Sequence, residues 1–200
     1  MTTKRSIDAY FSADVETDGP VPGPYSMLSF GMVYAGEFDG HEFIHPSHLD
    51  ISFYREVRPI SDNFVGEALD VNKLDRDKLK SKGADPHEAM TEAARWVQSV
   101  ANGRNPVLVA YPLAFDWTWL YWYFTVFSES GSPFGYSQCY DLKTAFATKA
   151  ELPISLSGRS RLPIDVKSLR RHTHHAVDDA VEQAEIFANL FEWRRRRERN

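Results

Sequence analysis

The sequence predicts an α/β domain in which a mixed β-sheet is covered by helices. The first sixty residues contain three apolar, strand-like segments separated by turn residues. A short apolar strand follows near the middle of the chain, and helical patterns flank it and fill the C-terminal half. With 200 residues and no internal repeat, the chain is expected to form a single domain over residues 1–200.

The N-terminal third is expected to form an antiparallel meander. Residues 7–15 form an apolar run, and residues 27–35 form a second run after the turn-forming Gly/Pro segment 19–24. Residues 51–58 alternate between apolar and polar side chains and stop at Pro59, which interrupts strand pairing. Three consecutive strands joined by turns favour antiparallel neighbours in one sheet.

The rest of the chain alternates between helices and one buried strand. Residues 86–100 carry apolar side chains at helical spacing and start with Pro86, which suits a first helical turn. Residues 106–110 are a short continuous apolar strand, expected at the centre of the sheet. The further expected elements are an aromatic buried helix at 115–124, a helix at 141–150, a polar loop at 158–163 and a helix at 173–193 with Thr173 as candidate N-cap.

The composition is that of an ordinary globular protein. Hydrophobic residues make up 42% and charged residues 26%, and Cys139 is the single cysteine, so neither an internal disulfide nor a zinc–cysteine cluster can form. We see no signal peptide and no membrane span, and therefore expect a cytoplasmic protein without a membrane partner. The net charge of -5 argues against a protein that coats nucleic acid by bulk electrostatics.

Positive charge gathers at the C-terminus, where residues 193–200 are expected to be a basic helix end. Five arginines and one glutamate lie within this segment. A solvated helix end, whose cations complement the helix dipole, is one interpretation, and attraction to phosphate is the other.

Two carboxylates stand side by side at the end of the first predicted strand. Asp14 and Glu16 are two residues apart, and side chains at that spacing point to the same face of a strand. Like charges placed this way repel each other, and a hard divalent cation would remove the repulsion. The pair therefore predicts half of a metal site, although a solvated turn is the alternative because Asp18-Gly19-Pro20 follows directly.

Further acidic and imidazole groups follow later in the chain. Asp116 lies just after the central strand, among aromatic residues that would make an unpaired carboxylate costly to bury. Near the C-terminus, the segment 174–180 reads His-His-Ala-Val-Asp-Asp-Ala. On helix geometry alone, His174 with Asp178 or His175 with Asp179 would share a face. Each feature has an ordinary helix-terminal explanation, but their joint occurrence favours a single site.

The order of these motifs resembles the DEDDh family of 3'-5' exonucleases, in the ribonuclease-H-like superfamily. This family includes the polymerase III proofreading subunit, ribonuclease T and oligoribonuclease. The similarity extends over residues 9–187 and rests on three short segments: 13–19, which contains Asp-x-Glu; 109–116, which ends in Phe-Asp; and 174–180, which contains His-x-Ala-x-x-Asp-Ala. It implies a mixed five-stranded sheet, an antiparallel meander plus parallel strands, flanked by helices.

The resemblance also implies roles for individual residues. Asp14, Glu16, Asp116 and Asp179 would be the metal carboxylates, and His174 would be the general base, since the family places its histidine five residues before the aspartate. Two Mg²⁺ or Mn²⁺ ions would activate the attacking water and stabilise the leaving oxygen of a phosphodiester. His172, His175 and Asp178 are expected to be exposed neighbours.

Substrate contacts are less clearly marked. Thr17 and Asp18 lie where the family meets the terminal nucleotide, and Tyr111-Pro112 replaces the family's frequent His-Asn, which puts substrate positioning in doubt. Phe30, Tyr111 and Trp117 could stack on bases, although the aromatic run 117–124 is better explained as core. Candidate phosphate contacts, with a solvated loop as the default, are Arg159, Arg161, Lys167, Arg170 and Arg171.

The expected function is hydrolysis of single-stranded nucleic acid from the 3' end to nucleoside monophosphates. DNA is slightly favoured over RNA because the first motif looks like that of a proofreading enzyme. An exoribonuclease, a phosphodiesterase for small dinucleotides and a catalytically idle binding module for nucleic acid or protein remain alternatives. Several relatives are dimers, so a homodimer is also an open expectation.

Overall fold

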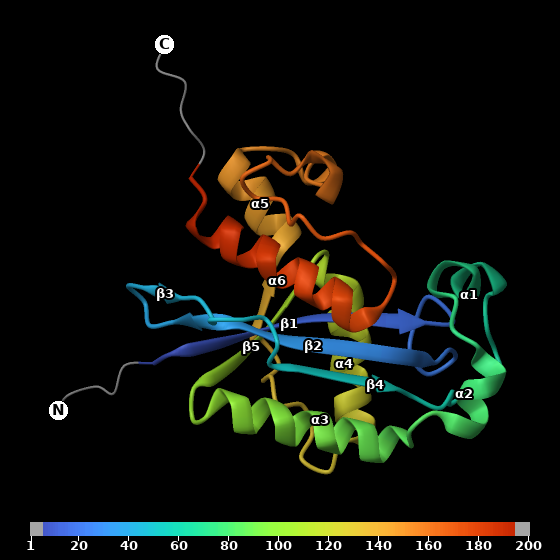
Figure 1. The fold of residues 1–200 in the computed structure, drawn as a ribbon. Helices are drawn as coiled ribbons and strands as arrows, with labels where there is room; N and C mark the ends of the chain where they lie inside the picture. The colour runs from blue at the N-terminus through green and yellow to red at the C-terminus, as the bar shows by residue number, and fades with distance from the viewer. Residues whose placement is uncertain (1–5, 195–200) are drawn as a thin grey trace.

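The computed structural model describes residues 6–194, which are built around one mixed β-sheet (Figure 1). The strand order is β3-β2-β1-β5-β6, and β4 also pairs with β2. Because β1 pairs with β2 along its length, β3 and β4 share the opposite edge of β2, and the sheet is five strands wide. The strands are β1 (Asp8–Thr17), β2 (Met27–Phe38), β3 (Phe43–Ile44), β4 (Ser52–Glu56), β5 (Asn105–Ala110) and β6 (Cys139–Asp141).

The directions of the strands confirm the predicted mixed sheet. β1, β2 and β4 form the antiparallel meander, whereas β5 runs parallel to both β1 and β6. Parallel neighbours end at the same edge of the sheet, so the carboxyl ends of β1 and β5 lie together. The first turn of the helix that follows β5 is thereby brought beside the end of β1.

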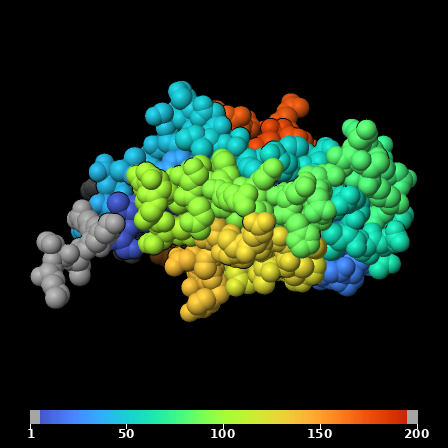
Figure 2. Space-filling view, turned by 90° about the horizontal axis from the view of Figure 1, so that it is seen from below, coloured from blue at the N-terminus to red at the C-terminus, as the bar shows by residue number. Residues whose placement is uncertain are grey.

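Helices cover both faces of the sheet. Phe11 on β1 and Phe30 on β2 belong to the hydrophobic core that contains α3 and α4, whereas Tyr10 on β1 and Val33 on β2 belong to the core that contains α5 and α6. Figure 2 looks at the α3 side, where α3 (yellow-green) forms a band across the surface. The helices are α1 (Gly66–Asn72), α2 (Arg76–Lys82), α3 (Pro86–Ala101), α4 (Leu113–Phe127), α5 (Leu142–Ala150) and α6 (Ala176–Glu192).

Two helices begin as the sequence predicts. The Asp85 side chain caps α3 by accepting the His87 N–H at 2.9 Å, and Pro86 occupies the first turn. Asp141 caps α5 by accepting the Thr144 N–H at 3.0 Å. The aromatic helix α4, which was expected to be buried, buries one face only, and Phe115 and Val126 are exposed. The Tyr123 hydroxyl accepts the Met27 N–H at 2.7 Å, which ties α4 to β2.

The beginning of the last helix was predicted wrongly. α6 starts at Ala176, not at residue 173, and its N-cap position is His175, which makes no side-chain cap. The backbone N–H of Thr173 instead donates to the carboxylate of Asp179. The helix ends at Glu192, and the greater part of the predicted basic helix end, residues 195–200, lies outside the described residues.

Several short elements were not expected from the sequence. These are β3, β6, α1 and α2, together with 3-10 turns at Ile154–Leu156 and Arg159–Arg161. The second turn lies within the segment 158–163 that was expected to be a loop. Within residues 6–194, no helix combines the length and apolar character needed to cross a bilayer.

Candidate active site

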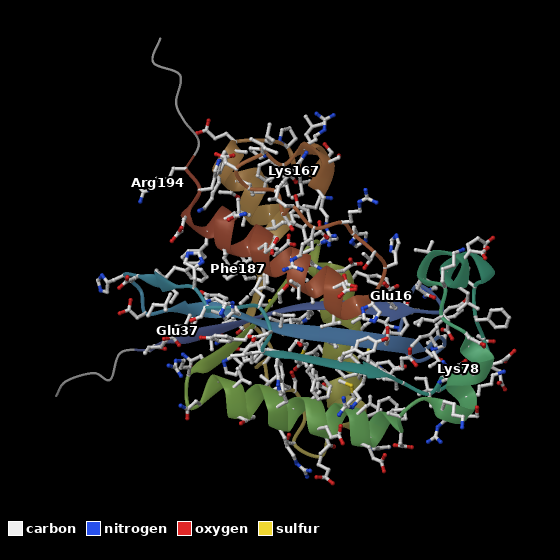
Figure 3. The ribbon with its side chains drawn as sticks, viewed as in Figure 1. Glu16, Glu37, Lys78, Lys167, Phe187 and Arg194 are labelled. Atoms are coloured by element: carbon white, nitrogen blue, oxygen red, sulfur yellow. The ribbon has the colours of Figure 1, made fainter. Side chains whose placement is uncertain are left out.

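Four carboxylates meet where β1 and β5 end. Asp14 and Glu16 lie on β1, Asp116 lies in the first turn of α4 and Asp179 lies in the first turn of α6. Oxygen atoms of Asp14, Glu16 and Asp179 lie within 4.8 Å of one another. Figure 3 shows Glu16 at the end of β1 beside the beginning of α6. Asp116 is buried next to this group and accepts the Val15 N–H at 3.1 Å.

Burial raises the pKa values of three of these carboxylates, and like charges add to the effect at Asp14 and Glu16. Burial, followed by the charges of Asp116, Glu16 and Asp179, raises the pKa of Asp14 well above its usual value, while Arg159 opposes the shift. Burial and the neighbouring carboxylates raise the pKa of Glu16 to about 8. Burial also raises the pKa of Asp116 to about 7, against the Val15 N–H and the charge of Arg159.

The donor set fits a divalent cation. Convergent carboxylate oxygens are the ligands that Mg²⁺ and Mn²⁺ prefer, and a cation among them would favour the ionised forms that burial disfavours. Among residues 6–194, the charge of Arg159 opposes the raised pKa values of Asp14 and Asp116 and offsets them only in part.

Backbone donors hold Asp179 in place at the start of α6. The N–H groups of Thr173 and His174 donate to its two carboxylate oxygens at 2.7 and 2.8 Å. This geometry turns the chain sharply, and His174 takes a φ of 58°, in the left-handed region. The turn places the side chain of His174, which is exposed, at the lining of the cavity above the carboxylates.

A second histidine belongs to the same cavity. His172 is exposed as predicted, but its Nδ1 lies 3.1 Å from Asp179 Oδ2 and 3.2 Å from Glu182 Oε2. Ligand atoms of His172, His174 and Asp179 lie within 4.8 Å of one another. By contrast, His175 faces Tyr54, with ring centroids 4.7 Å apart.

Another exposed neighbour was placed correctly by the sequence. Asp178 is exposed, as expected, and its carboxylate lies 3.2 Å from His175 Nδ1. Asp178 therefore points to solvent, whereas the adjacent Asp179 is fully buried.

Gln183 connects the acidic cluster to the second motif, and sequence reasoning missed it. Its Nε2 donates to Asp14 Oδ1 at 2.9 Å, and its Oε1 accepts the Tyr111 N–H at 2.6 Å. The signal was available in the sequence, because Gln183 lies four residues after Asp179 and thus on the same face of α6.

The carboxylates open into a cavity of about 870 Å³ with a basic rim. Of the five predicted phosphate contacts, Arg159, Lys167 and Arg170 line this cavity, whereas Arg161 and Arg171 lie outside its lining. Lys143 adds a further cation to the rim. Figure 3 shows Lys167 on the segment beside α5 and α6, away from Glu16.

The predicted substrate contacts at the end of β1 face inward. Asp18 is fully buried, pairs with Arg76 Nε at 2.8 Å and accepts the Ser26 N–H, so its carboxylate is not available to a substrate. Thr17 is also buried, and its hydroxyl donates to the Gly19 carbonyl at 2.9 Å. Both side chains thus have structural partners, and a contact of this segment with the terminal nucleotide, through a backbone amide or a hydroxyl, stays a prediction.

The aromatic face of the cavity also differs from the prediction. Phe30 is fully buried, and Trp117 stacks on Tyr121 at 5.0 Å away from the cavity lining. Tyr111 does line the cavity, although only 4% of it is exposed. Phe115, which sequence reasoning missed, lines the cavity with 41% of its surface exposed. Its position next to Asp116 was the available signal.

Comparison with known proteins agrees with this geometry. A family model described as "3'-5' exoribonuclease Rv2179c-like domain" matches residues 14–191. The 3'-5' DNA exonuclease Cap18 of Escherichia coli is 35% identical over 188 residues, which cover 94% of this chain and 92% of that protein.

Solved structures share the fold at low sequence identity. The nuclease domain of 3'hExo, described as a DEDDh family member bound to rAMP, superposes with a TM-score of 0.66 at 11% identity, covering 94% of this chain and 92% of that chain. The complex of E. coli exonuclease I with single-stranded DNA gives 0.58 at 18% identity, and the match spans 94% of this chain but 41% of that protein.

The family match extends from Asp14 on β1 almost to the end of α6, and thus includes the whole cavity. The sheet and its flanking helices share the fold of the 3'hExo nuclease domain. The chain is therefore a hydrolase with 3'-5' exonuclease activity on nucleic acid, and it belongs to the 3'-5' exoribonuclease Rv2179c-like family.

Proposed function

We propose that the chain is a Mg²⁺- or Mn²⁺-dependent exonuclease that removes nucleoside monophosphates from the 3' end of single-stranded nucleic acid, with DNA favoured over RNA. The observation that carries this proposal is the convergence of Asp14, Glu16 and Asp179, with Asp116 buried beside them. Buried carboxylates with raised pKa values at the floor of an open cavity are typical of a functional site.

Each residue has a role that follows from its place. Asp14, Glu16 and Asp179 would hold two ions, and Asp116 would support the site while it fixes the backbone of β1 at Val15. Gln183 would orient the Asp14 carboxylate. Bound divalent ions supply activation of a water molecule and neutralisation of charge on the phosphodiester.

His174 is the proposed general base. Its backbone is fixed by the bond to Asp179, and its exposed ring lies at the cavity, where it can reach a water molecule. An imidazole can accept a proton near neutral pH, which is what attack by water on a phosphodiester requires. Phe115 would offer a stacking face for the terminal base, because it is the half-exposed aromatic ring of the cavity.

DNA and RNA remain the two candidate polymers. The 35% identity to a DNA exonuclease supports DNA, whereas the description of the family model supports an exoribonuclease. Discrimination would rest on contacts to the 2'-hydroxyl. If the preferred substrate is a dinucleotide, the rate of hydrolysis should fall as the oligomer becomes longer.

The experiment uses DNA and RNA oligomers of the same sequence, each labelled at the 5' end. The wild-type protein is expected to produce a ladder that shortens by single nucleotides only when Mg²⁺ or Mn²⁺ is present. Asp179→Asn should lower the rate by about two orders of magnitude or more, as loss of an electrostatic contact in a reaction centre does. Asp178→Asn is the matched control, because this neighbour is exposed. If neither polymer shortens in the presence of metal, the proposal is wrong.

A further inference from the structure

Arg159 is the best-anchored cation of the cavity. Its Nη2 donates to the Tyr111 carbonyl at 3.0 Å, and its Nη1 donates to Glu182 Oε2 at 3.0 Å and lies 2.9 Å from His172 Nδ1. The guanidinium also lies over the Tyr111 ring, 5.6 Å from its centroid. A solvent-exposed arginine on a loop is not held by this many groups, because ordering the side chain costs conformational entropy.

The groups that hold Arg159 are themselves fixed. Tyr111 is 4% exposed, its N–H donates to Gln183, and its hydroxyl donates to the Ser157 carbonyl, two residues before Arg159. Tyr111 thus holds both the guanidinium and the chain that carries it. This gives a physical reason for tyrosine at position 111, because a smaller ring without the hydroxyl could not reach the Ser157 carbonyl.

Arg159 shares the cavity with the carboxylates and keeps donors free for a ligand. Arg159, Asp14 and Asp116 all line this one cavity. The contacts above involve three of the five N–H donors that a guanidinium offers, which leaves Nε and one hydrogen of Nη2. With 25% of its side chain exposed, Arg159 is accessible from the cavity.

We propose that Arg159 binds a non-bridging oxygen of the phosphate that is cleaved, and that Tyr111 and Glu182 position its guanidinium for this contact. The inference rests on the proposed function, because it needs a phosphodiester above the carboxylates. A planar guanidinium held on one edge can present its other donors to a phosphate, which a lysine cannot do in the same geometry. The alternative is an arginine that only compensates the negative charge of the cluster.

The test compares two ligands that differ only in phosphate. Thymidine 5'-monophosphate, a product of the proposed reaction, and thymidine are measured as competitive inhibitors of oligomer degradation. Arg159→Ala should weaken inhibition by the monophosphate about 10- to 100-fold, the usual range for a hydrogen bond to a charged group. Inhibition by thymidine should stay within about twofold, because the nucleoside lacks the phosphate that this contact needs.

The matched control is Arg161→Ala, which removes the same charge from the same 3-10 turn but lies outside the cavity lining. It should leave the inhibition constants of both ligands unchanged. The KM of the oligomer should rise in Arg159→Ala, and the slope of log KM against log salt should fall by about 0.7, the value for one lost contact to a single strand. Arg159→Lys keeps the charge and should recover only part of the monophosphate affinity.

Three outcomes are separable. If the wild type does not degrade any oligomer, the proposed function fails. If the wild type is active but Arg159→Ala changes neither the monophosphate constant nor the salt slope, the phosphate contact is refuted alone. An equal loss for monophosphate and thymidine would also refute it, since that pattern indicates a structural role. If a urea titration shows that Arg159→Ala folds poorly, inhibition by the monophosphate and by thymidine is compared in Arg159→Lys instead. A loss for the monophosphate alone would then support the phosphate contact, and no loss or an equal loss would refute it.

Discussion

Gly31 controls the distance between the sheet and the first turn of α6. It lies opposite Asp14 in the β1–β2 ladder, and a Cβ atom built on it would be 2.4 Å from the Val177 nitrogen and 2.6 Å from the Ala176 carbonyl carbon. Ordinary contacts begin at 3.4 Å, and these neighbours are backbone atoms that cannot rotate away. Gly31→Ala must therefore move the start of α6 by about 1 Å, which changes the position of Asp179.

This displacement should lower the activity of a protein that stays folded. A shift of about 1 Å in a reacting group can lower the rate about 100-fold, whereas an added methyl group in a packed interior usually costs about 1–3 kcal/mol. We expect kcat/KM for a labelled oligomer to fall about 100-fold in Gly31→Ala. The metal concentration that gives half of the maximal rate should rise, because the carboxylate oxygens of Asp14, Glu16 and Asp179 would no longer converge.

Gly66→Ala provides the control, because nothing lies within 4 Å of a Cβ at that position. It should retain wild-type activity and metal dependence. Urea unfolding of both variants separates loss of folding from loss of geometry. Wild-type kcat/KM and an unchanged metal requirement in folded Gly31→Ala would refute the argument that close packing of α6 on β2 sets the site.

Two further predictions follow from buried charges. Arg76→Ala leaves the fully buried Asp18 without its partner and should lower the free energy of unfolding by about 3–5 kcal/mol, while the double variant Asp18→Asn/Arg76→Met should lose less, both measured by urea titration. The second prediction concerns the pH dependence of stability without metal. In the folded state, the pKa values of Glu16 and Asp116 lie above their usual values. The folded state therefore binds more protons than the unfolded state between about pH 4 and 8. Stability in EDTA should therefore fall as pH rises through this window, and a urea midpoint that rises with pH would contradict this.

The sequence predicted the parts of the fold and site that depend on local pattern. The two-residue spacing of Asp14 and Glu16 determines their shared face on β1, and the apolar strand before Asp116 determines the edge at which that carboxylate emerges. The five-residue spacing of His174 and Asp179 came from the family resemblance. This spacing brings His174 to the cavity because the chain turns at His174 before α6 begins.

The parts that the sequence did not predict depend on contacts between distant residues. Asp18 was expected near the terminal nucleotide because of the family resemblance, yet its carboxylate pairs with Arg76, which lies 58 residues away on the unpredicted helix α2. Thr173 looked like an N-cap, but its N–H and its hydroxyl both donate to the Asp179 carboxylate, and the helix begins only at Ala176. The position of Phe115 relative to the cavity depends on how α4 leaves β5, which periodicity does not specify.

Short elements escaped prediction for a related reason. β3 contains two residues and β6 contains three, which is too few for an alternating pattern to be recognised. α1 starts after Val65 without a side-chain cap. It is fastened through the Val65 N–H, which donates to the Asp18 carbonyl at 2.7 Å, and this contact is visible only in the folded chain.

Isothermal titration calorimetry with Mn²⁺, in the absence of nucleic acid, measures directly whether Asp14, Glu16 and Asp179 form a metal site. The wild type and Asp178→Asn should bind the ion equally. Asp14→Asn should bind at least about tenfold more weakly, because it removes a charged ligand atom from the three that converge. Equal binding by all three proteins would contradict the account.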